Sequence, residues 1–144
     1  MPSMVRYEVD ELSFELPDGF ADESVNILIP TSPTGRNANI VVTREPRTEA
    51  PLGQQVVGIL TAAGEKVQGL KVLGHREREV GTVPGYEARS HSMTNKVPTY
   101  QRQVYLSWYG TLLCFTVSGA RAQNAFCDSL IEKLISTLRL KKKA

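Results

Sequence analysis

The two histidines are the side chains of this sequence best suited to acid–base chemistry, because their ordinary pKa lies near neutrality. His75 and His91 both fall in predicted strands that are rich in Arg and Glu. With Tyr86 they mark the one region where an enzymatic site could form, although a solvated strand face is the simpler interpretation. No serine stands in a nucleophile-elbow pattern, and no glycine stretch has phosphate-loop spacing. We therefore expect a protein that is not an enzyme and needs no cofactor.

Metal chemistry is equally unsupported by the spacing of the candidate ligands. The two cysteines, Cys114 and Cys127, lie too far apart for a metal-binding or redox pair. The acidic residues near the N-terminus lack the spacing of a calcium loop; they are Asp10, Glu11, Asp18, Asp22 and Glu23. We expect no metal site and two free thiols that are buried or half-buried, which is usual for unpaired cysteine.

A basic C-terminal end and a group of aromatic residues raise the question of nucleic-acid binding. The end consists of Arg139 and the three lysines 141–143, and the aromatic residues lie within 100–109. The net charge of the whole chain is only +2, so the remainder carries −2 once these four cations are removed. Without a broad cationic field we expect no nucleic-acid partner. The basic end is better explained as a solvated terminus that follows the negative end of a helix.

Length and composition fit one soluble globular domain over residues 1–144. Hydrophobic residues make up 41% and charged residues 22% of the chain, as in ordinary folded proteins. The first eight residues contain charges and a proline instead of the apolar run of a signal peptide. No stretch approaches the roughly 20 apolar residues of a membrane span. We therefore expect a cytoplasmic protein that does not insert into a membrane.

Hydrophobic periodicity predicts two helices among several strands. Apolar residues at steps of three and four predict amphipathic helices at about 51–68 and 121–138. Alternation predicts a short hairpin or bent strand that ends at a turn at 17–19, and then neighbouring antiparallel strands at 24–29 and 38–43. An antiparallel meander follows the first helix, with turns at 83–85 and at Gly110 and strands at 72–80, 85–94, 101–109 and 111–118.

These elements predict an α+β fold in which both amphipathic helices pack on one face of an antiparallel sheet. The charged run 76–79 should then project beyond the covered part of the sheet. Strands 24–29 and 38–43 carry branched apolar side chains on both faces. Leaving these side chains in water would forfeit about 1.5–3 kcal/mol each. Either a loop or terminus covers them, or they form an interface with a partner or a second subunit.

The opening stretch Phe14-Glu15-Leu16-Pro17-Asp18-Gly19-Phe20, followed by Asp22, Ser24, Val25, Asn26 and Ile27, resembles the DcrB-like family of small bacterial proteins. In particular it is similar to the effector-associated (Eag) chaperones of the type VI secretion system. The resemblance extends over nearly the whole chain. It implies a PsbP-like fold, no catalysis and a homodimer. It also implies a cytoplasmic role in binding the N-terminal transmembrane region of a toxic effector before the effector is loaded on the secretion spike.

Such a role would explain the surplus of apolar side chains. A transmembrane helix already satisfies its own backbone hydrogen bonds, so a chaperone has to shield its side chains from water. An apolar sheet face can receive helical anchors at steps of three and four. The partner-binding residues that we expect are Val25, Asn26, Ile27, Ile29, Ile40 and Val42. The alternative is a non-catalytic regulatory or scaffolding domain that binds a soluble protein through its sheet.

Overall fold

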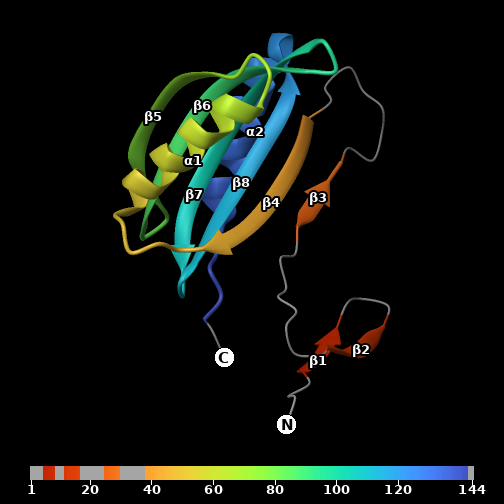
Figure 1. Cartoon of the computed structure of the whole chain (residues 1–144), viewed down its shortest axis with the longest axis vertical. Coiled ribbons are helices and arrows are strands. Elements are labelled where there is room, and N and C mark those ends of the chain that lie inside the picture. Colours follow the sequence, from red (N-terminus) through yellow and green to blue (C-terminus); the bar gives the residue numbers. More distant parts are fainter. Residues whose placement is uncertain (1–4, 9–11, 17–24, 30–37, 143–144) are drawn as a thin grey trace.

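Six antiparallel strands form one sheet in the computed structural model, and a two-stranded hairpin and two α-helices accompany it (Figure 1). The structure describes residues 5–8, 12–16, 25–29 and 38–142. The helices are α1 (Leu52–Lys66) and α2 (Asn124–Thr137), and the short 3-10 helix η1 (Arg121–Gln123) precedes α2. The strands are β1 (Val5–Glu8), β2 (Ser13–Leu16), β3 (Asn26–Leu28), β4 (Ala38–Pro46), β5 (Lys71–Val80), β6 (Val83–Thr94), β7 (Val97–Trp108) and β8 (Thr111–Ala120).

The strand order of the large sheet is β3-β4-β8-β7-β6-β5, which confirms the antiparallel meander. The predicted N-terminal hairpin is also present, as the pair β1–β2. The turn expected at 17–19 lies outside the described residues. The turn between β7 and β8 uses Tyr109 and Gly110 with φ of 45° and 77°, the positive values that a tight type I′ turn needs. The turn between β5 and β6 falls at residues 81–82, so the one expected at 83–85 is wrong.

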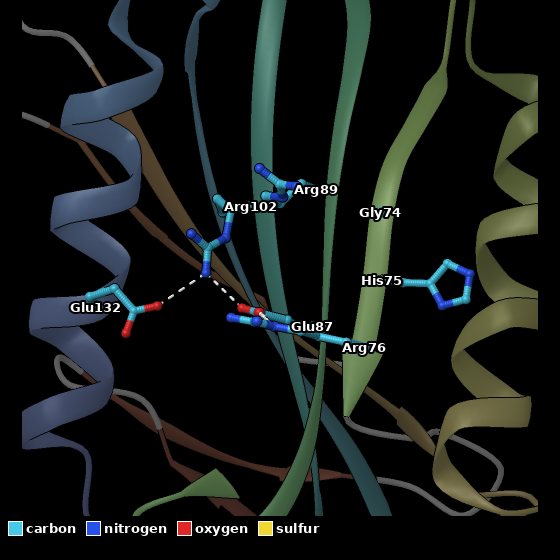
Figure 2. A pocket seen from close by; sticks show the side chains of 7 residues that line it. All are labelled: Gly74, His75, Arg76, Glu87, Arg89, Arg102 and Glu132. Atoms are coloured by element: carbon cyan, nitrogen blue, oxygen red, sulfur yellow. Dashed lines mark hydrogen bonds and ion pairs between the residues drawn. The ribbon is translucent and has the colours of Figure 1, made fainter. Parts of the chain in front are cut away.

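The two helices lie on opposite faces of the sheet, not on one face as expected. Val104 and Leu106 of β7 belong to a buried cluster with Ile131 of α2. Tyr105, between them, belongs to a separate cluster with Val56 of α1. Neighbouring residues of a strand point to opposite faces, so the two clusters lie on either side of the sheet. Figure 2 shows the same arrangement, with α2 on one side of the strands and α1 on the other.

The physical reason is that the central strands are apolar on both faces, so each face needs a cover. In β8, Leu112 and Cys114 pack in the α1 cluster, whereas Leu113 and Phe115 pack against the α2 cluster. α1 contacts β5, β6 and β7, and α2 contacts β7 and β8. The α+β fold class and the antiparallel sheet with two helices are therefore confirmed, while the placement of the helices is corrected.

Ion pairs fasten α2 to the sheet in addition to its apolar side. The Arg102 guanidinium donates to Glu87 at 2.6 Å, to Asp128 at 3.0 Å and to Glu132 at 3.1 Å. Burial opposes ionisation of Glu87, but the hydrogen bond from Arg76 and the charge of Arg102 lower the pKa of that carboxyl. Arg78 donates to Glu132 at 2.8 Å, so it does not project beyond the covered sheet as the charged run 76–79 was expected to do.

Both cysteines are buried free thiols, as expected. Burial raises the pKa of Cys114 to about 11, so this thiol stays protonated at neutral pH. Within the described part of the chain, no helix combines the length and the apolar character needed to cross a bilayer.

Candidate partner-binding surface

The described residues cover the α1 face of the sheet only in part. Figure 1 shows α1 in front of the strands on one side of the sheet, while β8, β4 and β3 continue beyond it without a helix on this face. On the other face, α2 lies over β7 and β8. The described elements therefore leave part of the α1 face, over β8, β4 and β3, accessible to a partner.

The strand register brings side chains from four strands into two adjacent rows on this open face. We call these two rows the uncovered surface. The first row is Ile27, Val41, Thr116 and Gln103, and the second is Asn39, Ser118 and Gln101. Ile27 is 64% exposed, and the other three members of the first row are half-buried. The rows are therefore apolar at the β3 edge and polar over β8 and β7.

The polar end of the uncovered surface is oriented by its own hydrogen bonds. The side-chain amide of Gln103 donates to Thr116 Oγ1 at 3.3 Å and accepts from the Tyr105 hydroxyl at 3.1 Å. The amide of Gln101 donates to Ser118 Oγ at 3.1 Å. Each of these groups keeps further hydrogen-bonding capacity, because an amide has two donors and a carbonyl has two lone pairs. The surface can therefore offer ordered polar contacts beside an apolar edge.

One flank of α1 borders this surface. Val57 lines a pocket with Val72 and His75, so this side of the helix faces the β5 edge. Helical geometry places Ile59 and Ala63 on the other flank, toward β7 and β8. Ile59 is half-buried against the α1 cluster. The uncovered surface is therefore a sheet floor with a helical wall along one side.

The expected partner-binding residues are divided between the two faces. Ile27 pairs with Val41 on the α1 face. Val25 and Ile29 flank β3 two residues before and two residues after Ile27, the spacing of side chains that share one face of a strand. They are 51% and 68% exposed.

The remaining three residues, Asn26, Ile40 and Val42, point to the α2 face. Ile40 already packs against the α2 cluster, so much of its side chain is taken up by the fold. The six residues therefore do not form one continuous surface.

Val41, Thr116 and Gln103 belong to the surface but are not among the residues predicted from the sequence. Alternation correctly predicts that Val41 lies on the face away from Ile40 and Val42, but it does not tell which of the two faces is open. The polar residues gave no local signal, because only the sheet order brings residues 103 and 116 next to residue 41.

The histidines do not meet to form a site. His75 Nδ1 lies 2.6 Å from the Tyr86 hydroxyl on the α1 face. His91 lies on the α2 face, with its ring edge-on to Tyr100. Among the described residues, no group of three or more His, Cys, Asp and Glu side chains is placed to hold a metal ion.

Comparison with known proteins gives one family and several related folds. The model of the DcrB family matches residues 11–137. No curated protein sequence matches the chain.

Among solved structures, a Pseudomonas aeruginosa protein of unknown function, PA94, for which a regulatory role has been suggested, is similar over 97% of this chain and 99% of its own, with 22% identity and a TM-score of 0.79.

Two more distant structures share the fold. The PsbP protein of the cyanobacterium Synechocystis sp. PCC 6803 (CyanoP) is similar at 13% identity and a TM-score of 0.56, over 98% of this chain and 94% of its own. LpqN, which is involved in cell envelope biogenesis of Mycobacterium tuberculosis, is similar at 9% identity and a TM-score of 0.51, over 91% and 86% of the two chains. At such low identity these similarities show the fold alone, and the expected PsbP-like fold is confirmed.

Proposed function

This chain belongs to the DcrB family, and from that premise we propose that it is a cytoplasmic chaperone for a type VI secretion effector. It binds the N-terminal transmembrane region of the effector and keeps it shielded from water until the effector is loaded on the secretion spike. The observation that supports the proposal is the uncovered surface, a stretch of sheet over which neither of the described α-helices lies and whose β3 edge is strongly exposed and apolar.

The dimensions of the surface suit one helix. Its first row crosses four strands, and at about 4.8 Å between strands the row is roughly 14 Å wide. An α-helix with side chains is about 10–12 Å across, so one helix fits on the floor beside α1. A wide and open surface is better suited to such a partner than to a small molecule, which binds in an enclosed pocket.

The chemistry of the surface suits a membrane-spanning helix. Half to two-thirds of the surface of Val25, Ile27 and Ile29 is exposed to solvent. Burying it under a partner would contribute about 1–2 kcal/mol of binding free energy for each residue. Membrane helices also pack through small and polar side chains that hydrogen-bond across the contact. The side chains of Gln103 and Thr116 would form hydrogen bonds with such polar groups of the bound helix. A wholly apolar surface would not discriminate between a helix of the effector, the client of the chaperone, and any other hydrophobic segment.

A homodimer and an indirect association with the spike belong to the same proposal, and they rest on the resemblance to the effector-associated chaperones. A dimer would present two uncovered surfaces. This would match an effector region that contains more than one membrane helix.

Co-expression tests the proposal directly. An effector fragment that contains its N-terminal membrane helices is expressed with and without this protein, and the soluble fraction is measured. We expect the fragment to accumulate in solution only when the protein is present. A fragment that is equally soluble and abundant alone would refute a chaperone role.

A regulatory or scaffolding domain is the alternative function, and the role suggested for PA94 favours it. On that alternative, the sheet binds a folded soluble protein. Introducing a charge with Ile27→Asp would then leave the binding of any membrane segment unaffected. Under the chaperone proposal, the same variant loses the client fragment.

A further inference from the structure

A second site of interest lies on the opposite face, between α2 and the β5–β6 edge of the sheet. It is a cavity of about 460 Å³. The lining residues are Gly74, His75, Arg76, Glu87, Arg89, Arg102 and Glu132. We call this cavity the arginine pocket. Figure 2 shows Arg89 and Arg102 close to each other on the α2 side of the strands, whereas the ring of His75 points away toward α1.

Two arginines face each other across adjacent strands in this pocket. Arg89 of β6 is the direct register partner of Arg102 of β7, so both side chains project from the same face. Like charges directly opposite each other are unfavourable in a sheet. Arg102 is compensated by three carboxylates, but Arg89 is not. Four guanidinium groups stand against three carboxylates here: Arg76, Arg78, Arg89 and Arg102 against Glu87, Asp128 and Glu132.

Hydrogen-bond donors remain unused at the same place. Arg102 is only 7% exposed, and its buried Nε–H has no acceptor. Arg89 is exposed, and no hydrogen bond or ion pair to it is found in the described part of the chain. A buried charged donor without an acceptor is unfavourable, and native proteins usually supply the missing partner.

Space for an acceptor is provided by a glycine. Gly74 is the register partner of Arg89 on β5, and a Cβ at that position would lie 3.6 Å from the Arg89 guanidinium. A larger side chain at residue 74 would extend into the pocket. The row of Gly74, Arg89 and Arg102 is therefore open in front of Arg89, while the Nε–H of Arg102 lies directly behind this opening and is closed to solvent.

We propose that the arginine pocket binds an oxyanion, either a phosphoryl group or a carboxylate, between Arg89 and Arg102. The oxyanion accepts from the exposed guanidinium of Arg89, and a small shift of the neighbouring side chains on binding lets the buried Nε–H of Arg102 donate to it as well. Arg76, whose side chain is largely exposed, lies at the rim. Arginine pairs are suited to such groups because the guanidinium presents parallel donors to two oxygens. The pocket lies on the face opposite the uncovered surface, so a client bound there would not cover it.

Titration of the full chain with two probes tests the proposal. Inorganic phosphate and a short peptide of alternating Asp and Glu are titrated at constant ionic strength, and binding is followed by calorimetry and by the amide NMR signals of β6 and β7. We expect one saturable site for at least one probe. A preference for phosphate would assign a phosphoryl ligand, and a preference for the peptide would assign carboxylates; both support the pocket as an oxyanion site.

Matched variants separate a specific site from general charge attraction. Arg89→Gln is expected to weaken the preferred probe about tenfold, and Arg89→Lys is expected to weaken it less. Arg139→Gln removes the same charge from the exposed segment after α2 and is expected to leave the affinity unchanged. The proposal is refuted if neither probe saturates, or if Arg139→Gln weakens binding as much as Arg89→Gln. Since Arg89 faces away from Ile27, either result leaves the chaperone test unaffected.

Discussion

Replacing Ile27 by alanine is expected to weaken the binding of a client helix by a factor of about 5 to 30. Burying an isoleucine completely contributes about 1.5–3 kcal/mol. Because 64% of Ile27 is still exposed, a client that covers it gains about two-thirds of that amount, or roughly 1–2 kcal/mol. This free energy corresponds to the stated change in Kd. The free energy of unfolding should change by only about 0.5 kcal/mol, because so much of the side chain lies outside the fold.

Leu28 provides the matched control for this experiment. It is the next residue of the same strand and is 53% exposed, but it pairs with Ile40 and therefore points to the α2 face. Leu28→Ala removes a similar apolar area from the other face. If the client lies on the uncovered surface, Leu28→Ala should change Kd less than twofold.

The assay titrates a fluorescently labelled N-terminal effector fragment, carried on a soluble fusion partner, with each purified variant. Urea denaturation of the same preparations checks that all are equally stable. A larger loss with Leu28→Ala than with Ile27→Ala would place the client on the α2 face. Unchanged affinity in both variants would show that the β3 edge makes no contact with the client, and the reasoning would fail.

Three further measurements test the interior. Glu87→Gln leaves the buried Arg102 underpaired, so the free energy of unfolding at pH 7 should fall by about 3 kcal/mol. The folded pKa of Glu87 is lowered from 4.5, so the stability that its carboxylate contributes is complete above about pH 4.5 and is lost as the pH falls through the folded pKa. The difference in unfolding free energy between wild type and variant should therefore shrink at pH 3. A difference that stays constant between pH 7 and pH 3 would contradict this prediction. Gly85→Ala puts a methyl group within 3.0 Å of a main-chain carbonyl of β7 and should destabilise by about 1–3 kcal/mol in the same urea titration. Finally, Cys114 and Cys127 should react with Ellman's reagent at pH 8 only in urea, and rapid reaction of the folded protein would show that they are not buried.

The helices and most strands could be predicted from local periodicity, but the faces that the helices cover could not. The face on which a helix packs depends on where the strands before and after it lie in the sheet. α1 connects β4 to β5, which are four places apart in the strand order, and local periodicity does not report that order. One clue was available, because Leu112, Leu113, Cys114 and Phe115 are apolar in succession. Such a run is typical of a strand that is buried on both sides, and it argues for a cover on each face.

The six expected partner-binding residues fall on two faces of the sheet for a related reason. Alternation within each strand was read correctly, but the register between strands was unknown. A shift of one residue exchanges the two faces, so pairing Ile27 with Val41 instead of Val42 moves half of the expected set to the other side. Nothing in the sequence of the connection between β3 and β4 indicates which of these two registers forms.

The sheet separates two hydrophobic clusters, one on each face, which share the backbone of the strands but have no buried side chain in common. Substitutions on one side should therefore combine additively with those on the other, as independent sites do. Under the proposed chaperone function, a change to the exposed residues of the α1 side would alter which client is bound and would leave the ion pairs between α2 and the sheet intact.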